Sequence, residues 1–314
     1  ASLYPVRQAL GPRVKRAAWS LLQRRAVWIV VCGVLSVAAV GAWWPKAGRA
    51  EVVFMDVGHG DAALVRTPGG TTLLVDGGSA APFYDYGRSV VSPVLWSAEV
   101  NRLDYVVVSH GDIDHIGGLE AVLEQFPVGA VLAGPELSGS EAGERLVALC
   151  HSRRVPIREL YAGDTLGLRG AGLEVLHPPA VYPEGTSEND LSLVCRITWP
   201  GMSVLFTGDI GAWGQREVSK RNAGAAVLKA PHHGSLSSID PHFSGAVGAR
   251  LAVLSVGGAY GGRFRRSGEA SPWGRGGCTV LRTDDAGAIR CWVQDGALAW
   301  STAREERGYP HRGP

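Results

Sequence analysis

Residues 109–115 read Ser-His-Gly-Asp-Ile-Asp-His. They join an apolar run at 103–110, which predicts a buried strand, to residues 115–125, whose apolar positions recur with helical spacing. This stretch holds four potential metal ligands, which are His110, Asp112, Asp114 and His115. On a strand-to-helix turn the first two can converge on one ion, and the last two can turn toward a second. An acidic N-cap would explain one aspartate but not the whole set. The stretch therefore predicts a metal site.

Two later segments repeat this placement of ligands at the end of a strand. Asp209 ends the run VLFTGD at 204–209, where its carboxylate could bridge two ions. His232 and His233 follow the run VLKAP at 227–231. Taken alone, a Gly-Asp pair is an ordinary turn and a His-His pair is a weak signal. Together with the first stretch they predict one site built from several strand ends.

The rest of the chain predicts an α/β fold with two β-sheets that helices cover on their outer faces. Short β-branched runs between Gly-rich turns predict a first set of strands at 52–57, 63–67, 71–78 and 103–110. A second set is expected at 173–179, 191–199, 203–209, 225–231 and 250–258. Helices are expected at 88–100, 115–125 and 212–222. With 46% hydrophobic and 19% charged residues the chain can form a packed core, which excludes wholesale disorder.

The five cysteines form no zinc-binding pattern, because no CxxC or Cys/His spacing is present. Cys278 and Cys291 flank a predicted hairpin, in which the strands TVLRT and AIR are joined by the turn DDAG. In an oxidising compartment a disulfide between them is conceivable. Two buried thiols are the alternative interpretation.

The N-terminal part predicts a membrane anchor. Residues 1–50 hold eight Lys and Arg and no acidic residue, whereas residues 51–314 hold 23 Lys and Arg against 29 Asp and Glu. Residues 26–44 form an uncharged run that would span about 28 Å as a helix, close to the thickness of a bilayer core. The six basic residues before it favour a cytoplasmic N-terminus and an extracytoplasmic remainder. A cleaved signal peptide ending near AGRA at 47–50 is the alternative.

These boundaries predict the organisation of the chain. We expect a basic cytoplasmic segment at 1–25, a transmembrane helix at 26–44, a linker at 45–50, one α/β domain at 51–303 and a tail at 304–314. The first residue is Ala rather than Met, so we expect the chain to be part of a longer protein.

Six segments, in this order, resemble one protein family. They are AEVVFMDVGHGDAALVRTPGGTTLLVDGG (50–78), SHGDIDHIGG (109–118), ENDLSLV (188–194), LFTGD (205–209), VLKAPHHGS (227–235) and VLRTDDAGAI (280–289). The set resembles the metallo-β-lactamase fold superfamily, and more narrowly the extracytoplasmic domain of the ComEC family of DNA-uptake competence proteins. The resemblance implies a metallo-β-lactamase-like αββα sandwich with a two-metal site at its strand ends, preceded by one transmembrane helix.

The resemblance also implies a set of metal ligands. They would be His110, Asp112, Asp114, His115, Asp209 and one of His232 and His233, holding two divalent ions. The carboxylate of Asp112, usual in the ComEC branch, shifts the preference toward Mn²⁺ or Mg²⁺, although Zn²⁺ also fits. Many members have another histidine where Asn189, Asp190 and Ser192 stand here, so one ion would be held less tightly.

Three aspartates near the start of the domain match the family's DVGxGD and DGG segments. Asp56, Asp61 and Asp76 would support the site through hydrogen bonds and turns. His59 stands where the family commonly has Gln, and we interpret it as a polar loop residue.

The implied activity is that of a metal-dependent phosphodiesterase, a nuclease acting on DNA at the outer face of the cytoplasmic membrane during uptake. Two ions would clamp a backbone phosphate and activate water. Asp114 would orient or deprotonate that water. Lys229, His233 and Ser235 would neutralise charge on the phosphate oxygens. The implied partners are DNA, as a single strand, the cytoplasmic membrane and a membrane channel domain that this sequence does not contain.

One segment departs from the family pattern. After residues 255–257 the family usually shows Asn and then Tyr-Gly-His-Pro, whereas residues 258–277 read GAYGGRFRRSGEASPWGRGG. Its arginines could contact phosphates or form a solvated loop; they are Arg263, Arg265, Arg266 and Arg275. The missing histidine leaves open a catalytically impaired DNA-guiding module. The acidic balance of residues 51–314 leaves open a different phosphoester, such as cell-wall choline phosphate.

Overall fold

The computed structural model describes residues 50–235, 239–257 and 271–306, which all belong to one compact unit, Ala47–Pro314. The predicted cytoplasmic segment, the predicted transmembrane helix and the end of the tail lie outside the described residues. So do three of the arginines singled out above, namely Arg263, Arg265 and Arg266. Within the described ranges, no helix combines the length and the apolar character needed to cross a membrane.

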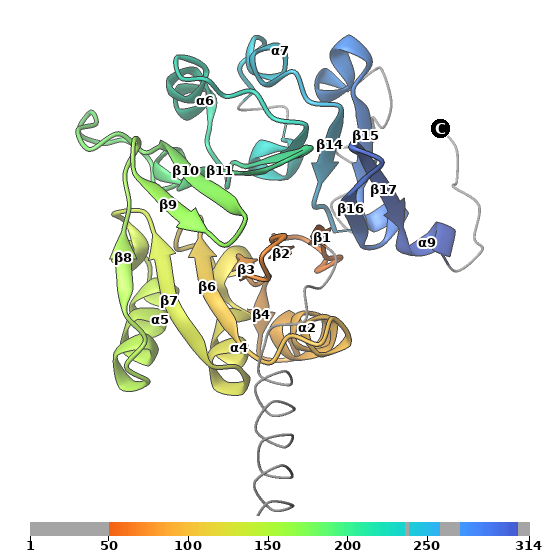
Figure 1. The fold of residues 1–314 in the computed structure, drawn as a ribbon. Helices are drawn as coiled ribbons and strands as arrows, with labels where there is room; N and C mark the ends of the chain where they lie inside the picture. The colour runs from red at the N-terminus through yellow and green to blue at the C-terminus, as the bar shows by residue number, and fades with distance from the viewer. Residues whose placement is uncertain (1–49, 236–238, 258–270, 307–314) are drawn as a thin grey trace, which may run out of the picture. The chain divides into compact units, whose positions relative to one another are not determined.

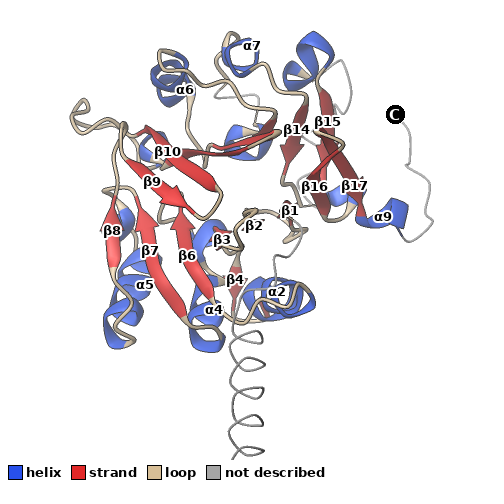
Figure 2. Ribbon diagram, in the orientation of Figure 1, coloured by secondary structure: helices blue, strands red, loops and turns tan. Residues whose placement is uncertain are grey.

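Two β-sheets make up the centre of the fold (Figures 1 and 2). The first has the order β17-β16-β1-β2-β3-β6-β7-β8. Its strands are β1 (Glu51–Phe54), β2 (Ala63–Arg66), β3 (Thr72–Val75), β6 (Leu103–Val108), β7 (Val128–Ala133), β8 (Ile157–Glu159), β16 (Ile289–Gln294) and β17 (Ala297–Thr302). The second has the order β15-β14-β13-β12-β11-β10-β9. Its strands are β9 (Thr165–Leu168), β10 (Ala171–His177), β11 (Val194–Trp199), β12 (Met202–Phe206), β13 (Val227–Lys229), β14 (Leu251–Leu254) and β15 (Thr279–Arg282).

Helices lie on the outer faces of both sheets (Figure 2). The first sheet is covered by α2 (Ser92–Ser97), α4 (Leu119–Gln125) and α5 (Glu141–Ser152), and the second by α6 (Ala212–Ser219) and α7 (Phe243–Val247). Shorter elements are β4 (Ala80–Ala81), β5 (Tyr84–Asp85), α3 (Ile113–Ile116), α8 (Thr283–Ala286), α9 (Ala303–Glu306), the π-helix Gly87–Val91 and the 3₁₀ turns Leu137–Gly139, Asn189–Leu191, Pro231–Gly234 and Pro272–Gly277.

The alternation of side chains along each strand separates the layers of the core. In β1, Val52 and Phe54 pack between the two sheets, whereas Val53 packs against the helices outside the first sheet, as does Met55, which follows the strand. A third apolar cluster lies under α6 and α7 on the outer face of the second sheet. The result is a four-layered αββα sandwich, which confirms the αββα architecture predicted from the sequence.

The helix predicted over 115–125 is two helices, α3 and α4, separated by Gly117 and Gly118. A Cβ atom at Gly118 would lie 2.2 Å from the carbonyl oxygen of Gly77, and one at Gly117 would lie 2.4 Å from the backbone nitrogen of Ala80. Only glycine permits such a close approach of backbones. The break lets the short α3, which carries Asp114 and His115, pack directly against the loop after β3.

The hairpin predicted between Cys278 and Cys291 is wrong. β15 pairs with β14 in the second sheet, whereas β16 lies between β1 and β17 in the first. The expected turn DDAG is largely the helix α8, which carries the chain from one sheet to the other. Cys291 therefore packs between the sheets and Cys278 on the outer face of the second, and both are free, buried thiols.

This arrangement makes a prediction about thiol chemistry. Burial raises the pKa of Cys291 to about 12, so its thiolate, the nucleophilic form, is scarce at pH 8. Iodoacetamide at pH 8 should leave Cys291 unlabelled in the folded protein and should label both Cys278 and Cys291 once the chain is unfolded without reductant. Peptide mass spectrometry reads both outcomes, and a cross-linked Cys278–Cys291 peptide would contradict the arrangement.

Candidate metal centre

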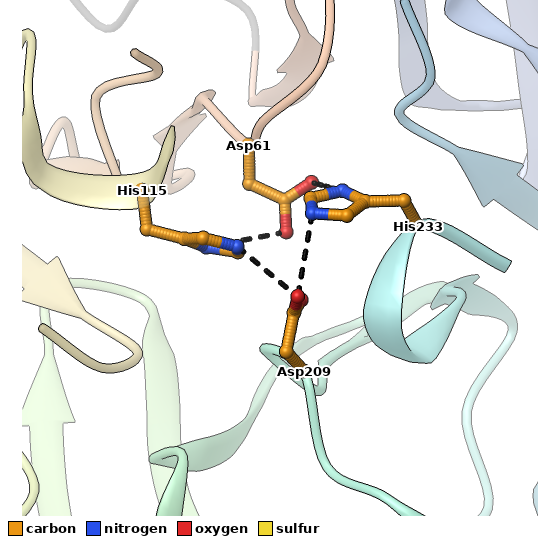
Figure 3. A group of neighbouring side chains, drawn as sticks. All are labelled: Asp61, His115, Asp209 and His233. Carbon is orange, nitrogen blue, oxygen red and sulfur yellow. Dashed lines mark ion pairs between the residues drawn. The ribbon is translucent and has the colours of Figure 1, made fainter. Parts of the chain in front are cut away.

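Four side chains meet in a buried cluster: Asp61, His115, Asp209 and His233 (Figure 3). One ligand atom of each lies within 4.8 Å of the others. Asp209 stands between two imidazoles, because its Oδ1 lies 3.3 Å from His115 Nε2 and its Oδ2 lies 3.3 Å from His233 Nε2. Asp61 faces the same rings, with Oδ2 3.6 Å from His115 Nδ1 and Oδ1 3.5 Å from His233 Nδ1.

The fold brings these residues together from both sheets. β6 runs parallel to β3 and β7, and β12, β13 and β14 are parallel to one another. The carboxyl ends of parallel neighbours lie at the same edge of a sheet. His115 follows β6, Asp209 follows β12 and His233 follows β13, while Asp61 lies in the loop between β1 and β2. The strand-end placement predicted from the sequence is therefore what positions the cluster.

The turn after β13 has an unusual backbone. His232 and His233 have φ angles of 48° and 53°, in the left-handed region that residues other than glycine seldom adopt. Backbone strain of this kind tends to be kept at functional sites. The turn directs His233 into the cluster, whereas His232 Nε2 stays 3.9 Å from Asp209 Oδ2 with 38% of its side chain exposed. Of the two histidines that the sequence left open, His233 is the one within the cluster.

Asp76 holds His115 in place. Its Oδ1 accepts a 2.8 Å hydrogen bond from the backbone N–H of Ser109, and its Oδ2 accepts one of 2.8 Å from Ser109 Oγ. The same Oδ2 lies 3.0 Å from His115 Nδ1, which leaves His115 Nε2 facing Asp209. This is the supporting role expected for Asp76. Asp56 is exposed and accepts a 3.4 Å hydrogen bond from the backbone of Gly58 within its own loop.

The charges of the cluster reinforce one another. Burial by itself would lower the pKa of each buried histidine, but the neighbouring Asp209 carboxylate outweighs it, so the pKa of His115 is well above its usual value and that of His233 is raised to about 10. Burial would raise the pKa of Asp209, yet His233 and His115 hold it well below its usual range. For Asp114, the neighbouring His233 and His115 imidazoles outweigh the effect of burial and lower the pKa to about 2. The carboxylates therefore stay ionised at neutral pH.

Lys229 lies inside the protein rather than at the mouth of the site. Its side chain is 4% exposed, and its Nζ forms an ion pair with Asp61 Oδ2, lies 3.6 Å from Asp209 Oδ1 and donates a 3.3 Å hydrogen bond to the carbonyl of Gly208. Burial opposes its charge, but the two carboxylates raise its pKa above the usual value. The predicted contact with phosphate oxygens does not match this position, because the ammonium is occupied by Asp61 and Asp209.

The other predicted ligands lie beside the cluster. Asp114 Oδ2 is 3.3 Å from His233 Nε2. His110 Nε2 is 3.3 Å from Asp112 Oδ2, and the His110 ring centroid is 4.2 Å from that of His115. Among the described residues, the groups of three or more mutually close ligand atoms include Asp114 but not His110, Asp112 or His232.

The segment in which many family members have another histidine adds no ligand atom to these groups. Asp190 Oδ1 accepts a 3.1 Å hydrogen bond from the backbone of Gly214 in α6. Ser192 Oγ accepts one of 3.1 Å from the backbone N–H of Asp209. These residues fix the turn that presents Asp209.

The cluster has the properties of a site for a divalent ion. The Nε2 atoms of His115 and His233 and the Oδ1 atoms of Asp61 and Asp209 are buried without a hydrogen-bond partner. Each such atom costs about 1–3 kcal/mol when left unsatisfied, so several in one place indicate that a bound cation completes them. Imidazole nitrogen and carboxylate oxygen are ligands of Zn²⁺ and Mn²⁺. The residues present therefore fit divalent ions.

The sequence-based prediction gave two residues, Asp61 and His59, a smaller role than the structure does. Asp61 was expected only to support the site, yet its carboxylate lies among the candidate ligand atoms, and His59, interpreted as a polar loop residue, forms a second group with Asp114 and His233. The signal that could have found them is local. In the loop Gly58-His59-Gly60-Asp61 two potential ligands lie beside glycines, and Gly60 allows the loop to approach Asp114 of α3 closely.

The chain is similar to known proteins over most of its length. The family model described as the metallo-beta-lactamase superfamily matches residues 55–240. The chain is 30% identical over 258 residues to ComE operon protein 3 of Bacillus subtilis, covering 78% of this chain and 33% of that protein. It is 31% identical over 307 residues to Competence protein ComA of Neisseria gonorrhoeae, covering 95% and 40%. Among solved structures, the metallo-beta-lactamase fold protein YhfI from Bacillus subtilis aligns with a TM-score of 0.48 and 14% identity over 80% of this chain and 99% of that one.

The chain thus spans about a third of the length of ComE operon protein 3 and two fifths of that of ComA. Its similarity to these proteins confirms the resemblance drawn from the six ordered motifs. Because the family model covers more than half of the residues and includes most of the predicted metal ligands, the chain belongs to the metallo-β-lactamase superfamily.

Proposed function

We propose that this metal-dependent hydrolase is a phosphodiesterase that cleaves DNA. The observation that carries the proposal is the buried cluster of Asp61, His115, Asp209 and His233, with its unsatisfied nitrogen and oxygen atoms. Bound divalent ions would supply Lewis-acid activation of a phosphoryl oxygen and of water. Membership of the superfamily supports metal-dependent hydrolysis, and cleavage of DNA phosphodiesters is inferred from the relatives, one of which is named Competence protein ComA.

Three side chains of the site have separate roles in this proposal. Asp209 connects the two histidines of the cluster, because one of its oxygens faces the His115 imidazole and the other faces the His233 imidazole. Asp114, with 25% of its side chain exposed, is the carboxylate nearest to solvent in these contacts and is suited to accept a hydrogen bond from the attacking water. His233, which contacts Asp61, Asp114 and Asp209, orders all three carboxylates.

A cleft beside α3 is suited to the bases of a DNA strand. It has a volume of about 290 Å³ and lies between the β4–β5 hairpin, α3 and α5, and its lining includes Pro82 and Ile113. At the turn of the hairpin Phe83 is 99% exposed and Tyr84 is 51% exposed. Exposed aromatic rings are the usual stacking platforms for unpaired bases. Ile113 lies between Asp112 and Asp114 in the sequence, so α3 carries residues of both the cleft and the metal centre.

The location and partners follow from the same proposal. We infer that the catalytic domain works at the outer face of the cytoplasmic membrane, anchored through the apolar run at 26–44. The relatives are two to three times as long as this chain, so we infer that a membrane channel domain acts with it and takes up the strand that is not degraded.

The rival substrate has one observation in its favour. The 29 acidic against 23 basic residues of 51–314 repel a polyanion, which favours a small phosphoester such as choline phosphate. A direct comparison separates the two. The 314-residue chain in detergent, with Mn²⁺ or Zn²⁺, should degrade single-stranded DNA, lose that activity in EDTA and leave p-nitrophenyl phosphocholine intact. Nitrophenol release with intact DNA would favour the rival, and salt-sensitive DNA binding without any product would favour a DNA-guiding module.

A further inference from the structure

The loop that carries His59 is held against two other segments. Gly58 and Gly60 have φ angles of 67° and 135°. A Cβ atom at Gly60 would lie 2.2 Å from the carbonyl oxygen of Asp114, and one at Gly257 would lie 2.6 Å from the backbone nitrogen of His59. The backbone N–H of Asp61 also donates a 3.2 Å hydrogen bond to the carbonyl of Asp114. The position of His59 relative to α3 is therefore fixed by backbone contacts.

The His59 imidazole faces two residues of the metal centre. Its Nε2 lies 3.9 Å from Asp114 Oδ2, and its ring centroid lies 4.4 Å from that of His233. One ligand atom from each of His59, Asp114 and His233 lies within 4.8 Å of the other two. The side chain of His59 is 30% exposed, so this group is more accessible than the buried cluster.

The separations between these ligand atoms suit a shared ion. A distance of 3.9 Å between His59 Nε2 and Asp114 Oδ2 exceeds hydrogen-bond range. Ligand atoms bound at about 2.1 Å to one ion lie roughly 3–4 Å from one another. His233 Nε2 is 3.3 Å from Asp114 Oδ2, which is also in that range.

We propose that His59 is an additional metal ligand, which completes the coordination of the ion nearest to solvent together with Asp114 and His233. Two imidazole nitrogens and one carboxylate suit an ion of intermediate softness, Zn²⁺ or Mn²⁺, rather than Mg²⁺. The imidazole enters from the β1–β2 loop. His59 thereby supplies a ligand in place of the histidine that many family members have at 189–192. That segment adds no ligand atom to the groups found among the described residues.

The test measures metal binding, without DNA or turnover, so its result does not depend on the proposed nuclease activity. The 314-residue chain in detergent is titrated with Mn²⁺ after chelator treatment, and free Mn²⁺ is followed by electron paramagnetic resonance. His59→Ala should weaken the binding of one ion at least about tenfold. His242→Ala, which removes an exposed histidine at the start of α7, should bind as the parent does.

A second measurement distinguishes a ligand from a structural residue. Pulsed electron paramagnetic resonance of the Mn²⁺-loaded protein reports the imidazole nitrogens bound to the ion. His59→Gln, which keeps a polar side chain in the loop, should lose one nitrogen coupling, and the His242→Ala variant should keep it. The proposal is overturned if both His59 variants bind Mn²⁺ with the parent affinity, or if the nitrogen couplings of His59→Gln equal those of the parent.

Discussion

Asp209→Asn is expected to reduce kcat/KM for the metal-dependent reaction about 10³-fold and to release most of the bound ion. The two oxygens of Asp209 each lie 3.3 Å from a different imidazole nitrogen, so this one carboxylate connects both sides of the cluster. Asparagine keeps the shape but removes the negative charge and one ligand oxygen. A loss of several kcal/mol of stabilisation at the metal corresponds to a factor of about 10³ in rate. Kinetics and metal content by mass spectrometry measure the two effects on the same sample.

A matched variant controls for the loss of a carboxylate as such. Asp295 is exposed in the turn between β16 and β17 and has a φ angle of 52°, a conformation that asparagine also tolerates. Asp295→Asn should keep parent activity and parent metal content. Retention of more than a tenth of the parent activity by Asp209→Asn would show that Asp209 does not bridge the centre.

The sequence predicted those parts of the site whose metal-ligating residues can be recognised within one short segment. Residues 109–115 hold several ligand types on a strand-to-helix turn, and Asp209 and His233 each end an apolar run. Strand ends are local features, and parallel neighbours bring them to one edge without further information. The two sets of short β-branched runs, each followed by helical stretches, likewise predicted two sheets with covered outer faces.

The parts that were wrong or missed depend on contacts between distant segments. The TDDA stretch has the composition of a turn, and nothing local shows that it carries the chain from the second sheet to the first, where β16 pairs with β1. Asp61 was expected only to support the site through hydrogen bonds and turns. Its place in the cluster depends on His115, His233 and Lys229, which lie 54 or more residues away in the chain.

Lys229→Met is expected to lower the free energy of unfolding of the metal-free protein by about 3–5 kcal/mol, because it leaves buried carboxylates without their partner. The Lys229 ammonium forms an ion pair with Asp61 and lies 3.6 Å from Asp209, and both carboxylates are buried. Its pKa is raised above the usual lysine value despite burial. This stabilisation is therefore fully present at pH values below the usual lysine pKa and is lost only as the pH rises through the raised one. Urea unfolding in EDTA at neutral pH measures the effect.

Lys220→Met is the matched control, because the Lys220 side chain is 67% exposed and its pair with Glu217 lies on the surface, where such pairs contribute about 1 kcal/mol or less.

Saturating Mn²⁺ should recover part of the stability lost in Lys229→Met, since a divalent cation supplies positive charge to the same carboxylates. Asp61→Asn combined with Lys229→Met should be less destabilised than Lys229→Met alone, because the double variant no longer buries the unpaired Asp61 charge. Equal destabilisation by Lys229→Met and Lys220→Met would contradict a charge-balancing role. If the double variant lost as much stability as the two single variants added together, Lys229 and Asp61 would not be energetically coupled.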